Sequence, residues 1–594
     1  MAKKKRSKTG QANHTPLLAN NDHAAPNGGR RGSLIIRAFL AEEAQKPIYH
    51  GADEEHAHEM ILKWADLESD GHLDRKETAL DAEFLHDIFG EALGYKIQTD
   101  SPKGWQLERQ FTVPGIGTAD GALGDFRPGQ AVSPVGVIEL KDAYTDLDRK
   151  PFNGRTAVRQ CWDYLAHLPD CPWGIVSNFV SFRLYHRDHT PLVYEQFTLQ
   201  EMRDRKRFRE FYCLFELGGL LRSRMRQPPR ALLLLTRTGE RQREVGDRLY
   251  ESYSRNRSQL IDHLHGKHEK TLEQAIAIAQ KILDRIIFVA FCEDRGLLPH
   301  KTLERTYKDV PYLGKVTNPR WQAFVRLFGA VNAGDARLFL NRGYNGGLFE
   351  HDPDVDELQL DDDWTLFFQE VGSYDFRDEV NVDVLGHLFE KSITELEKLR
   401  QGGLFNGAGT TAESESRMPK SAQRKRFGIY YTPPDFTRFL VRSTVGQVIA
   451  ERFASLAKAL GVDPNGEPDD PKLARNYALR RLEILRDIKA CDPACGSGAF
   501  LFQAYDVFEE HYQTVANSLS AHAPKEAEAL EEQIPDLILV NNLFGVDLSA
   551  EAVEITRLAL WIRTARRGKT LADLSNNIIV GNSLVTDPDV DPRA

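Results

Sequence analysis

The sequence predicts a multidomain α/β chain in which a long helical segment joins two α/β regions. Its 594 residues exceed the roughly 100–200 residues of one ordinary domain. Short strand-like runs and helical patterns alternate between Ile48 and Tyr194 and again after Phe427. Residues 195–400 show mainly the 3.6-residue apolar spacing of helices. We therefore expect two mixed α/β domains and a helical connector between them.

The composition excludes several classes of protein. No apolar run approaches the ~20 residues of a membrane-spanning helix, and the N-terminus lacks a signal-peptide pattern, so we expect a cytoplasmic protein without a membrane partner. The 6 cysteines occur singly, which indicates reduced thiols rather than disulfides or structural zinc. The net charge of −10 does not exclude DNA, because a local basic groove can supply phosphate contacts.

The first 194 residues divide into a tail and a compact domain. Residues 1–32 begin MAKKKRSK and show little periodicity, which predicts a disordered basic arm. Residues 48–194 predict an α/β domain that starts with a helix ended by Gly94. Its expected elements are that helix at Arg75–Leu93, strands at Gly117–Phe126 and Pro134–Lys141, a helix at Gly154–Leu168, and strands at Trp173–Ser177 and Ser181–Tyr185.

Charged residues on the two central strands of this domain form a candidate catalytic set. Glu139 and Lys141 flank Leu140, so both side chains project from the same face of their strand. Asp120 on the preceding strand can come opposite them, and Asp125 is the alternative acid. Two converging carboxylates can hold Mg²⁺ with open water positions, and a nearby lysine can orient or activate the attacking water. A Glu-x-Lys pair alone is more often a solvated strand face.

The order of these elements resembles the PD-(D/E)xK nucleases. The Asp120 strand precedes the strand of Glu139 and Lys141, and Gln160 and Tyr164 on the next helix match the QxxxY element of some of these nucleases. The resemblance implies a DNA endonuclease that depends on Mg²⁺. It also implies that Asp120 and Glu139 bind the metal and that all five residues belong to the catalytic set.

Residues 195–426 predict a connector and a linker. Thr271–Leu298 has a strong apolar stripe and predicts a core helix. With residues 380–393, it resembles the helical connector of single-chain restriction–modification enzymes. The basic and aromatic run Arg203–Tyr212 is either a phosphate-binding face or an ordinary linker helix. Residues 401–426 are rich in Gly, Ser and Thr and then basic, which indicates a flexible linker.

A second candidate site surrounds Cys491–Phe500, CDPACGSGAF. The apolar run Leu485–Ala490 before it predicts a strand, and the pattern after it predicts a helix. Gly496 and Gly498 allow a tight turn with positive φ that brings backbone N–H groups close to a ligand. Asp492 at the strand end can accept hydrogen bonds from a ligand amine. A lone Gly-x-Gly is more often an ordinary strand-to-helix turn.

Four segments in order resemble the S-adenosylmethionine-dependent DNA adenine-N6 methyltransferases. They are FGIYYTP at 427–433, DPACGSGAF at 492–500, LFGVDL at 543–548 and NNIIVGNSL at 576–584. The resemblance implies an incomplete Rossmann-like methyltransferase domain over 427–594. It implies that this domain binds S-adenosyl-L-methionine by its methionine end, its ribose and its adenine. The residues implied to bind the cofactor are Tyr430, Tyr431, Thr432, Pro433, Asp492, Ala494, Gly496, Gly498, Phe500, Asp547 and Asn582. The Asp547 carboxylate suits the two ribose hydroxyls, because it can accept from both.

Together the two resemblances imply the N-terminal part of a bifunctional restriction–modification enzyme of type IIG/IIL that acts on double-stranded DNA. The sequence contains no catalytic NPP(Y/F) motif; the nearest segments are TPPD at 432–435 and QPPR at 227–230. We therefore expect a truncated protein or a separate chain that supplies this motif and the target recognition domain. The alternatives are a phage-defence methyltransferase with an inactive nuclease-like domain, and a non-catalytic remnant that needs a partner.

Overall fold

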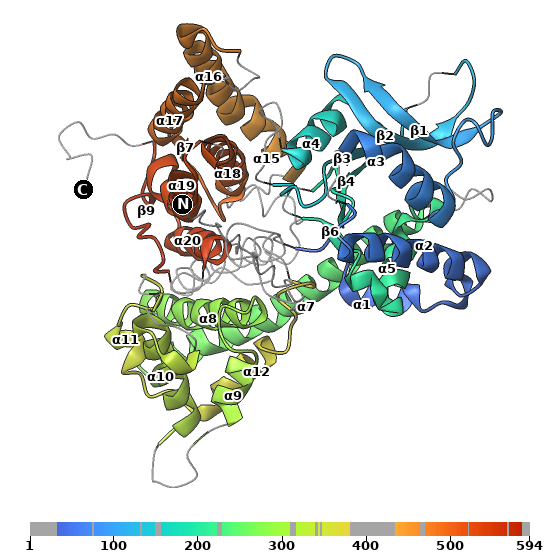
Figure 1. The fold of residues 1–594 in the computed structure, drawn as a ribbon. Coiled ribbons are helices and arrows are strands. Elements are labelled where there is room, and N and C mark those ends of the chain that lie inside the picture. The colour runs from blue at the N-terminus through green and yellow to red at the C-terminus, as the bar shows by residue number, and fades with distance from the viewer. Residues whose placement is uncertain are drawn as a thin grey trace, which may run out of the picture.

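The chain folds into three units that follow one another in sequence (Figure 1). The computed structural model describes residues 32–73, 77–130, 133–148, 156–189, 191, 193–221, 228–308, 310, 317–338, 343–344, 347–380, 434–463, 468, 470–520, 522–566 and 569–584. We call 32–221 the N-terminal unit, 228–380 the middle unit and 434–584 the C-terminal unit. The expected basic arm up to residue 31 and the expected linker at 401–426 lie outside the described residues. None of the helices searched in the described part has the length and apolarity to cross a membrane.

The N-terminal unit is built on a six-stranded sheet in the order β1-β2-β3-β4-β5-β6. The strands are β1 (Trp105–Val113), β2 (Gly117–Phe126), β3 (Gly136–Leu140), β4 (Trp173–Ser177), β5 (Ser181–His186) and β6 (Glu195–Thr198). Only β3 and β4 are parallel, because α4 (Ala157–His167) crosses over between them. The predictions for β2 and β4 are confirmed to the residue, whereas β1 and β6 were not predicted.

Helices cover both faces of this sheet. One face, with Ile138 and Leu140, packs against α1 (Arg37–Ala44), η1 (Pro47–Tyr49), α2 (Ala52–Ser69), α3 (Glu77–Phe84), η2 (Leu85–Ala92), η3 (Glu201–Arg203), α5 (Arg205–Phe215) and α6 (Leu217–Leu220). The other face, with Val137, packs against α4. Because neighbouring strand residues point to opposite faces, Glu139 lies on the α4 side.

The expected helix and boundary of this unit differ in detail from the structure. The helix predicted at Arg75–Leu93 is α3 continued by the π-helix η2, and Gly94 ends it with φ of +81° as predicted. The sheet and its helices continue to Leu221, past the expected boundary at Tyr194, because β6 and α5 pack on the same core.

One long helix, α7 (Arg230–Lys267), leads from the N-terminal unit into the middle unit (Figure 1). At about 1.5 Å per residue it is roughly 57 Å long. Ala231 and Leu234 at its start belong to the N-terminal core, and Leu260 and Leu264 at its end belong to the middle core. The middle unit continues with α8 (Leu272–Asp294), α9 (Thr302–Lys308), α10 (Pro319–Ala333), η4 (Ala336–Leu338), α11 (Pro353–Asp356), η5 (Asp362–Trp364) and α12 (Thr365–Val371). Helix α8 confirms the predicted core helix.

The C-terminal unit holds a three-stranded parallel sheet in the order β7-β8-β9. Its strands are β7 (Ala490–Asp492), β8 (Leu543–Asp547) and β9 (Ile578–Val580), and its helices are α15 (Pro434–Val441), η6 (Arg442–Gly446), α16 (Gln447–Leu460), α17 (Pro471–Asp487), α18 (Ala499–Ser520), α19 (Pro524–Leu537), η7 (Ile538–Asn542) and α20 (Ala550–Thr564). The strand predicted at Leu485–Ala490 is wrong, because α17 continues to Asp487. Its buried residues Ala478, Leu482 and Leu485 keep helical spacing, and the strand begins only at Ala490.

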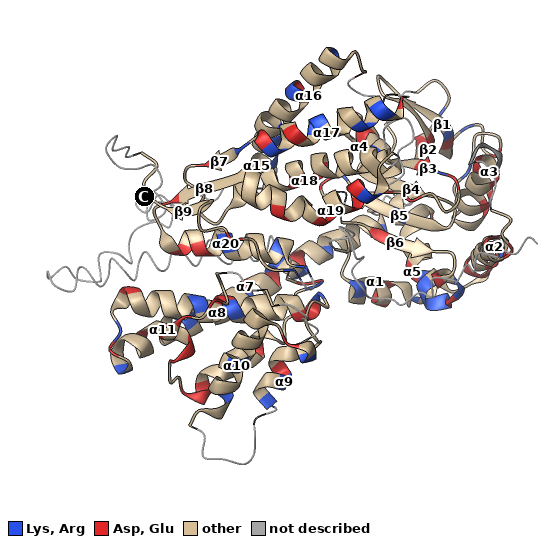
Figure 2. Cartoon of the chain, turned by 60° about the vertical axis from the view of Figure 1, so that its left-hand side comes forward, with Lys and Arg blue, Asp and Glu red and all other residues tan. Residues whose placement is uncertain are grey.

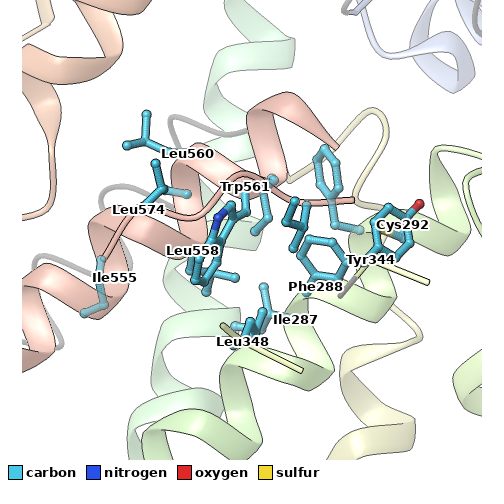
Figure 3. Packing of buried hydrophobic residues seen from close by; sticks show 14 of the residues in the cluster. Ile287, Phe288, Cys292, Tyr344, Leu348, Ile555, Leu558, Leu560, Trp561 and Leu574 are labelled. Atoms are coloured by element: carbon cyan, nitrogen blue, oxygen red, sulfur yellow. The ribbon is translucent and has the colours of Figure 1, made fainter. Parts of the chain in front are cut away.

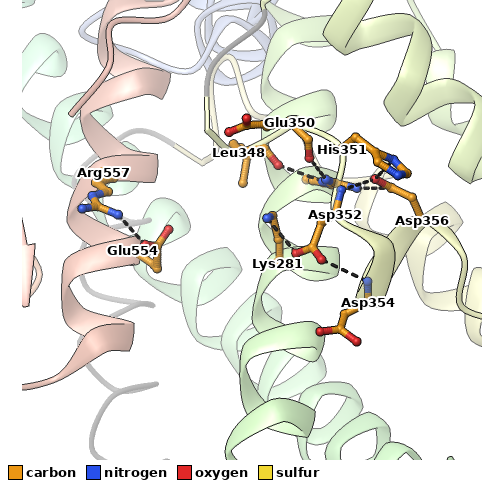
Figure 4. Close-up of polar contacts among 10 residues, drawn as sticks. Lys281, Leu348, Glu350, His351, Asp352, Asp354, Asp356, Glu554 and Arg557 are labelled. Carbon is orange, nitrogen blue, oxygen red and sulfur yellow. Dashed lines mark hydrogen bonds and ion pairs between the residues drawn. The ribbon is translucent and has the colours of Figure 1, made fainter. Parts of the chain in front are cut away.

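The middle and C-terminal units share one hydrophobic core, whereas the N-terminal unit has its own. Figure 3 shows Ile287 and Phe288 of α8 beside Leu558 and Trp561 of α20. Lys281 Nζ donates to Asp352 Oδ2 at 2.8 Å within the middle unit, and Figure 4 shows this pair together with Glu554 and Arg557 of α20. The C-terminal unit is therefore held by the middle unit's helices as well as by its own.

Candidate functional site

Asp120, Glu139 and Lys141 meet at the end of β3; we call them the carboxylate–lysine centre. Strands β2 and β3 are antiparallel, and Gly121 lies opposite Ile138. One residue further along each strand, Asp120 therefore comes opposite Glu139. The Leu140 N–H donates to Asp120 Oδ2 at 2.8 Å. Lys141 Nζ donates to the Glu139 carboxylate and, at 2.8 Å, to the Leu140 carbonyl. The side chains predicted from the sequence are therefore brought together.

The centre is buried and carries a net negative charge. Glu139 is 1% exposed and Lys141 is 8% exposed. Burial raises the pKa of the Asp120 carboxyl, although the Leu140 N–H and the charge of Lys141 oppose this shift. Two carboxylates with one ammonium group in a poorly solvated place favour an additional cation.

The donor set of this centre is small but suits a hard cation. Mg²⁺ usually takes one or two protein carboxylates and keeps several waters. In the part of the chain that the structure describes, no group of three or more His, Cys, Asp or Glu side chains is arranged to hold a metal. A Mg²⁺ ion at Asp120 and Glu139 would therefore complete its coordination with water.

Helix α4 contributes two hydrogen-bonded side chains, Gln160 and Tyr164, next to the carboxylate–lysine centre. Gln160 Nε2 donates to Tyr164 Oη at 2.7 Å, and Tyr164 Oη donates to the Thr118 carbonyl at 2.9 Å. Burial and the nearby Glu139 charge raise the pKa of the Tyr164 phenol. The Gln160–Tyr164 pair thus ties α4 to β2 two residues before Asp120. Asp125, the alternative acid, is exposed further along β2 and does not join the centre.

Sequence reasoning missed one residue beside this centre, Gln110 on β1. Its Nε2 lies 3.5 Å from Asp120 Oδ1, and its φ is +54°. Non-glycine residues rarely adopt positive φ, and they tend to do so at functional sites. Because β1 was not predicted as a strand, nothing in the sequence placed Gln110 opposite Asp120.

The basic stretch on α5 is tied to α2 by ion pairs. Arg205 and Arg209 donate to the buried Glu54 carboxylate at 2.7 Å and 3.0 Å. Figure 2 shows acidic and basic residues interspersed over the described elements. These two arginines therefore fit neither a phosphate-binding face nor a linker helix, because they pack against α2 within the N-terminal unit.

The segment between β7 and α18, Asp492–Gly498, forms a tight turn; we call it the glycine turn. Gly496 and Gly498 have φ of +52° and +87°, which confirms the predicted positive φ. A Cβ atom on Gly498 would lie 2.9 Å from Thr556 Cγ2, so this position also requires glycine for close packing. Thr556 Oγ1 donates to the Gly496 carbonyl at 2.8 Å, and α20 thereby supports the turn.

Two acids end the strands beside the glycine turn. Asp547 Oδ2 accepts from the Gly496 N–H at 2.8 Å, and its Oδ1 accepts from the Ser549 N–H at 2.9 Å. Asp492 Oδ1 accepts from the Ala494 N–H at 3.1 Å, but Asp492 Oδ2 is buried and has no hydrogen-bond partner among the described residues. Burial, together with the Asp547 charge, raises the pKa of the Asp492 carboxyl.

The buried Asp492 Oδ2 is free to accept a hydrogen bond from a ligand, since no described residue donates to it. A buried oxygen without a donor costs about 1–3 kcal/mol, which a ligand amine in this place would offset. The described residues therefore fit a ligand that carries an ammonium group.

The remaining predicted residues of this site lie near the glycine turn or outside the described part of the chain. Phe500 packs against the shared core, and Asn582 is exposed just after β9, where its Oδ1 accepts from the Leu584 N–H at 3.0 Å. Ser583, which the sequence did not single out, donates to the Pro493 carbonyl at 2.8 Å and ties this end to the glycine turn. Four predicted residues lie outside the described residues: Tyr430, Tyr431, Thr432 and Pro433.

Comparison with known proteins finds similarities in the C-terminal unit and beyond it. Residues 472–581 match the family model of the MmeI DNA-methyltransferase domain. A putative type II restriction enzyme and methyltransferase of Methanocaldococcus jannaschii is 28% identical over 350 residues, which are 51% of this chain and 27% of that protein. The chain is homologous to bifunctional restriction–modification enzymes. The match with the type II restriction enzyme and methyltransferase Eco57I of Escherichia coli, 24% over 343 residues, covers 54% of this chain and 28% of that protein.

These matches cover only part of the relatives. The aligned region spans about a quarter of the length of the two restriction–modification enzymes, 27% and 28%. The adenine-specific methyltransferase BrxX of Escherichia coli is 28% identical over 221 residues, which are 36% of this chain and 16% of that protein. Among solved structures, the type IIL restriction–modification enzyme MmeI in complex with DNA aligns with a TM-score of 0.36 and 18% identity, over 57% of this chain and 40% of that one.

Proposed function

We propose that this chain is part of a restriction–modification enzyme with two activities. The N-terminal unit cleaves double-stranded DNA with Mg²⁺, and the C-terminal unit binds S-adenosylmethionine for methyl transfer to adenine N6. The observation that carries the cleavage proposal is the convergence of Asp120, Glu139 and Lys141 in a chain homologous to restriction–modification enzymes. The glycine turn and the match to a DNA-methyltransferase family model support the second activity.

In the proposed nuclease, each side chain of the carboxylate–lysine centre has a separate task. Asp120 and Glu139 would hold Mg²⁺, which would supply Lewis-acid stabilisation of the charge that develops on the phosphate. Lys141 is a point charge beside Glu139, so it orients the attacking water or stabilises the same charge. The Gln160–Tyr164 pair keeps α4 against β2 and thereby fixes the position of Asp120.

In the proposed methyltransferase, the strand-end acids bind S-adenosylmethionine, which supplies the methyl group. Asp492 would hold the methionine ammonium, since its Oδ2 has no donor among the described residues. Asp547 uses its remaining lone pairs for the ribose hydroxyls, because a carboxylate offers about four acceptor sites. The resemblance to adenine-N6 methyltransferases would put Asn582, which follows β9, beside the adenine ring. Methyl transfer also needs an adenine-holding NPP(Y/F) segment, which we propose a further segment or a separate chain provides.

The test of cleavage separates metal binding from catalysis. Asp120→Ala and Glu139→Ala should lose both Mg²⁺ affinity and plasmid cleavage, because each removes a metal ligand. Lys141→Ala should keep Mg²⁺ binding while the cleavage rate falls by about 10²-fold or more. Calorimetry with Mg²⁺ and plasmid cleavage by the full chain measure the two properties.

Asp125→Ala is the matched control, because this exposed carboxylate sits on the same strand but outside the centre. It should bind Mg²⁺ and cut DNA like the wild type. Normal cleavage by all three variants of the centre would show that these strands are only structural.

The similarity to an adenine-specific methyltransferase favours one alternative, a modification enzyme whose N-terminal unit no longer cuts. That alternative predicts no Mg²⁺-dependent cleavage by the wild type, with S-adenosylmethionine binding unchanged. The two functions are therefore distinguished by the same pair of assays.

A further inference from the structure

Two neighbouring histidines at the end of α7 have buried nitrogens without a partner. His263 lies near the end of α7, and His268 is the residue directly after the helix. The centres of the two rings lie 5.3 Å apart, and the ring planes are inclined by 61°. The Nε2 atoms of both rings are buried and have no hydrogen-bond partner among the described residues. We call these two side chains the histidine pair.

The unpartnered nitrogens of the histidine pair are suited to accept a ligand. Buried polar atoms in native proteins nearly always have a partner, so two adjacent exceptions need an explanation. A neutral imidazole carries one N–H group and one lone pair. Burial lowers the pKa of both imidazoles and the charge of nearby Lys267 adds to this shift, although Asp361 opposes it. Both rings are therefore neutral near neutral pH, and each keeps a lone pair.

Asp361 supplies a third donor atom beside the histidine pair. Its Oδ2 lies 3.9 Å from His263 Nε2 and accepts from Lys267 Nζ at 2.6 Å. Two ligand atoms of a tetrahedral metal with bonds of about 2.0–2.1 Å are roughly 3.4 Å apart, so Asp361 has to move by only about 0.5 Å. No three such side chains of the described residues are already arranged around a metal, and this small shift would complete the set. The Lys267 side chain is 58% exposed, so its ammonium group can turn into solvent.

The elements around these three side chains hold them in place. Asp361 directly precedes η5, and its carbonyl accepts from the Trp364 N–H at 3.2 Å. The next residue, Asp362, accepts from the Trp321 N–H at 2.9 Å through its carboxylate, which ties η5 to α10. The Trp364 ring lies 5.2 Å from the His263 ring. The donor atoms thus come from ordered elements, and a ligand that binds them has little chain to immobilise.

The donor set indicates a transition-metal ion rather than Mg²⁺. Imidazole nitrogens suit Zn²⁺, Cu²⁺ and Ni²⁺, whereas Mg²⁺ and Ca²⁺ take oxygen ligands. Two histidines and one carboxylate hold Zn²⁺ in other proteins, with water in the fourth position. This set therefore differs in its chemistry from the carboxylate–lysine centre.

We propose that His263, His268 and Asp361 form a binding site for a divalent transition-metal ion such as Zn²⁺. The ion would join the end of α7 to η5 and stabilise the middle unit, because it binds the folded arrangement and not the unfolded chain. This inference does not depend on the proposed cleavage or methyl transfer, since all three side chains belong to the middle unit.

Calorimetry of the full chain with Zn²⁺ alone tests this site. After removal of bound metals, His263→Gln and His268→Gln should each bind one Zn²⁺ fewer than the wild type, or bind it about 100-fold more weakly. Even a group that only supports a metal ligand is worth about 10–100-fold in affinity. Zn²⁺ should also raise the unfolding temperature of the wild type more than that of either variant.

Asp361→Asn is a second kind of variant that tests the third ligand. The Asp361 side chain is 45% exposed, so this change keeps the test valid if a histidine variant does not fold. It should weaken Zn²⁺ binding, because an amide oxygen carries no charge for the metal.

His265→Ala is the matched control, since His265 is exposed on the same helix and its Nδ1 contacts the Lys270 carbonyl at 2.7 Å. It should bind Zn²⁺ like the wild type. Zn²⁺ binding in His263→Gln, His268→Gln and Asp361→Asn that equals the wild type would overturn the inference. A wild type that binds no Zn²⁺, or an equal loss in His265→Ala, would overturn it as well.

Discussion

The two candidate sites differ in how their polar groups are satisfied. In the carboxylate–lysine centre, Lys141 donates to Glu139 and the Leu140 N–H donates to Asp120. In the glycine turn the acids are held by backbone N–H groups instead: Gly496 and Ser549 donate to Asp547, and Ala494 donates to Asp492. The first site is organised by a lysine paired with one of two carboxylates, and the second by a backbone turn that leaves an acceptor for a ligand. Substitutions should therefore act through charge at the first site and through backbone shape at the second.

The two sites also differ in the hydrophobic core that supports them. The sheet around the carboxylate–lysine centre has its own hydrophobic clusters, whereas the glycine turn belongs to a unit whose core continues into the middle unit. Damage at the glycine turn should therefore reach α8 and α20 but leave the N-terminal unit intact.

The largest effect is expected from Gly498→Ala. The new Cβ would lie 2.9 Å from Thr556 and 3.3 Å from Phe502, in a backbone with φ of +87°. Left-handed strain and overpacking each cost about 1–3 kcal/mol, so the turn should move and S-adenosylmethionine binding should be lost. Calorimetry with the cofactor measures this, and cleavage by the N-terminal unit should not change.

Gly496→Ala is the control for Gly498→Ala, because its φ is also positive but its Cβ would meet nothing within 4 Å. It should weaken binding less. Equal losses in the two variants would mean that packing against Thr556 does not shape the turn.

Asp492→Asn should change stability and binding in opposite directions. Burial and the charge of Asp547 raise the pKa of the Asp492 carboxyl, so the folded state holds its proton more tightly than the unfolded state. The stability that this group contributes is present below its unfolded pKa and is lost as pH rises through its folded pKa. The neutral amide removes that loss, so the ligand-free variant should melt at a higher temperature near neutral pH. Its affinity for S-adenosylmethionine should fall by about 10-fold, since a charged hydrogen bond is lost.

Thermal scans with and without cofactor follow both effects of Asp492→Asn. A variant that melts earlier than the wild type, or that binds the cofactor equally well, would contradict the role of Asp492 as an acceptor held ready for a ligand.

The smallest effect concerns pH and the core of the middle unit. Burial raises the pKa of Glu293 on α8 from 4.5 to about 7, although its carboxylate accepts from the Leu303 N–H at 2.9 Å. Its contribution to stability is therefore complete below pH 4.5 and is lost as pH rises through about 7. Glu293→Gln should remove this part of the pH dependence from the unfolding of the middle and C-terminal units, as measured by melting curves at several pH values. An unchanged pH profile in the variant would assign the dependence to other groups.

Much of both sites could be predicted from local sequence patterns, and the failures have physical causes. Alternating residues on β3 and glycines that demand positive φ leave direct signals, so Glu139, Lys141, Gly496 and Gly498 were found. Strand β1 was not predicted, because several of its residues are exposed or half-buried and the apolar alternation is weak. The conformation of Gln110 is imposed by the sheet around it, and no local pattern encodes it.

The start of β7 was predicted wrongly for a different physical reason. An alternating apolar run at Leu485–Ala490 fits a strand locally, but Leu485 also continues the buried helical face of α17. Packing against α18 decides between the two, and that contact lies outside any local window. Side-chain contacts such as Asp492 Oδ2 without a donor likewise emerge only from the folded arrangement.

The most direct test of the account is to titrate Mg²⁺ and S-adenosylmethionine separately into the wild type, Glu139→Ala and Asp547→Ala by calorimetry. The wild type should bind both ligands. Glu139→Ala should lose Mg²⁺ and keep S-adenosylmethionine, whereas Asp547→Ala should bind S-adenosylmethionine less tightly, by about 1–3 kcal/mol, and keep Mg²⁺. Failure of the wild type to bind either ligand, or loss of both ligands in a single variant, would contradict the claim that this chain carries two separate centres.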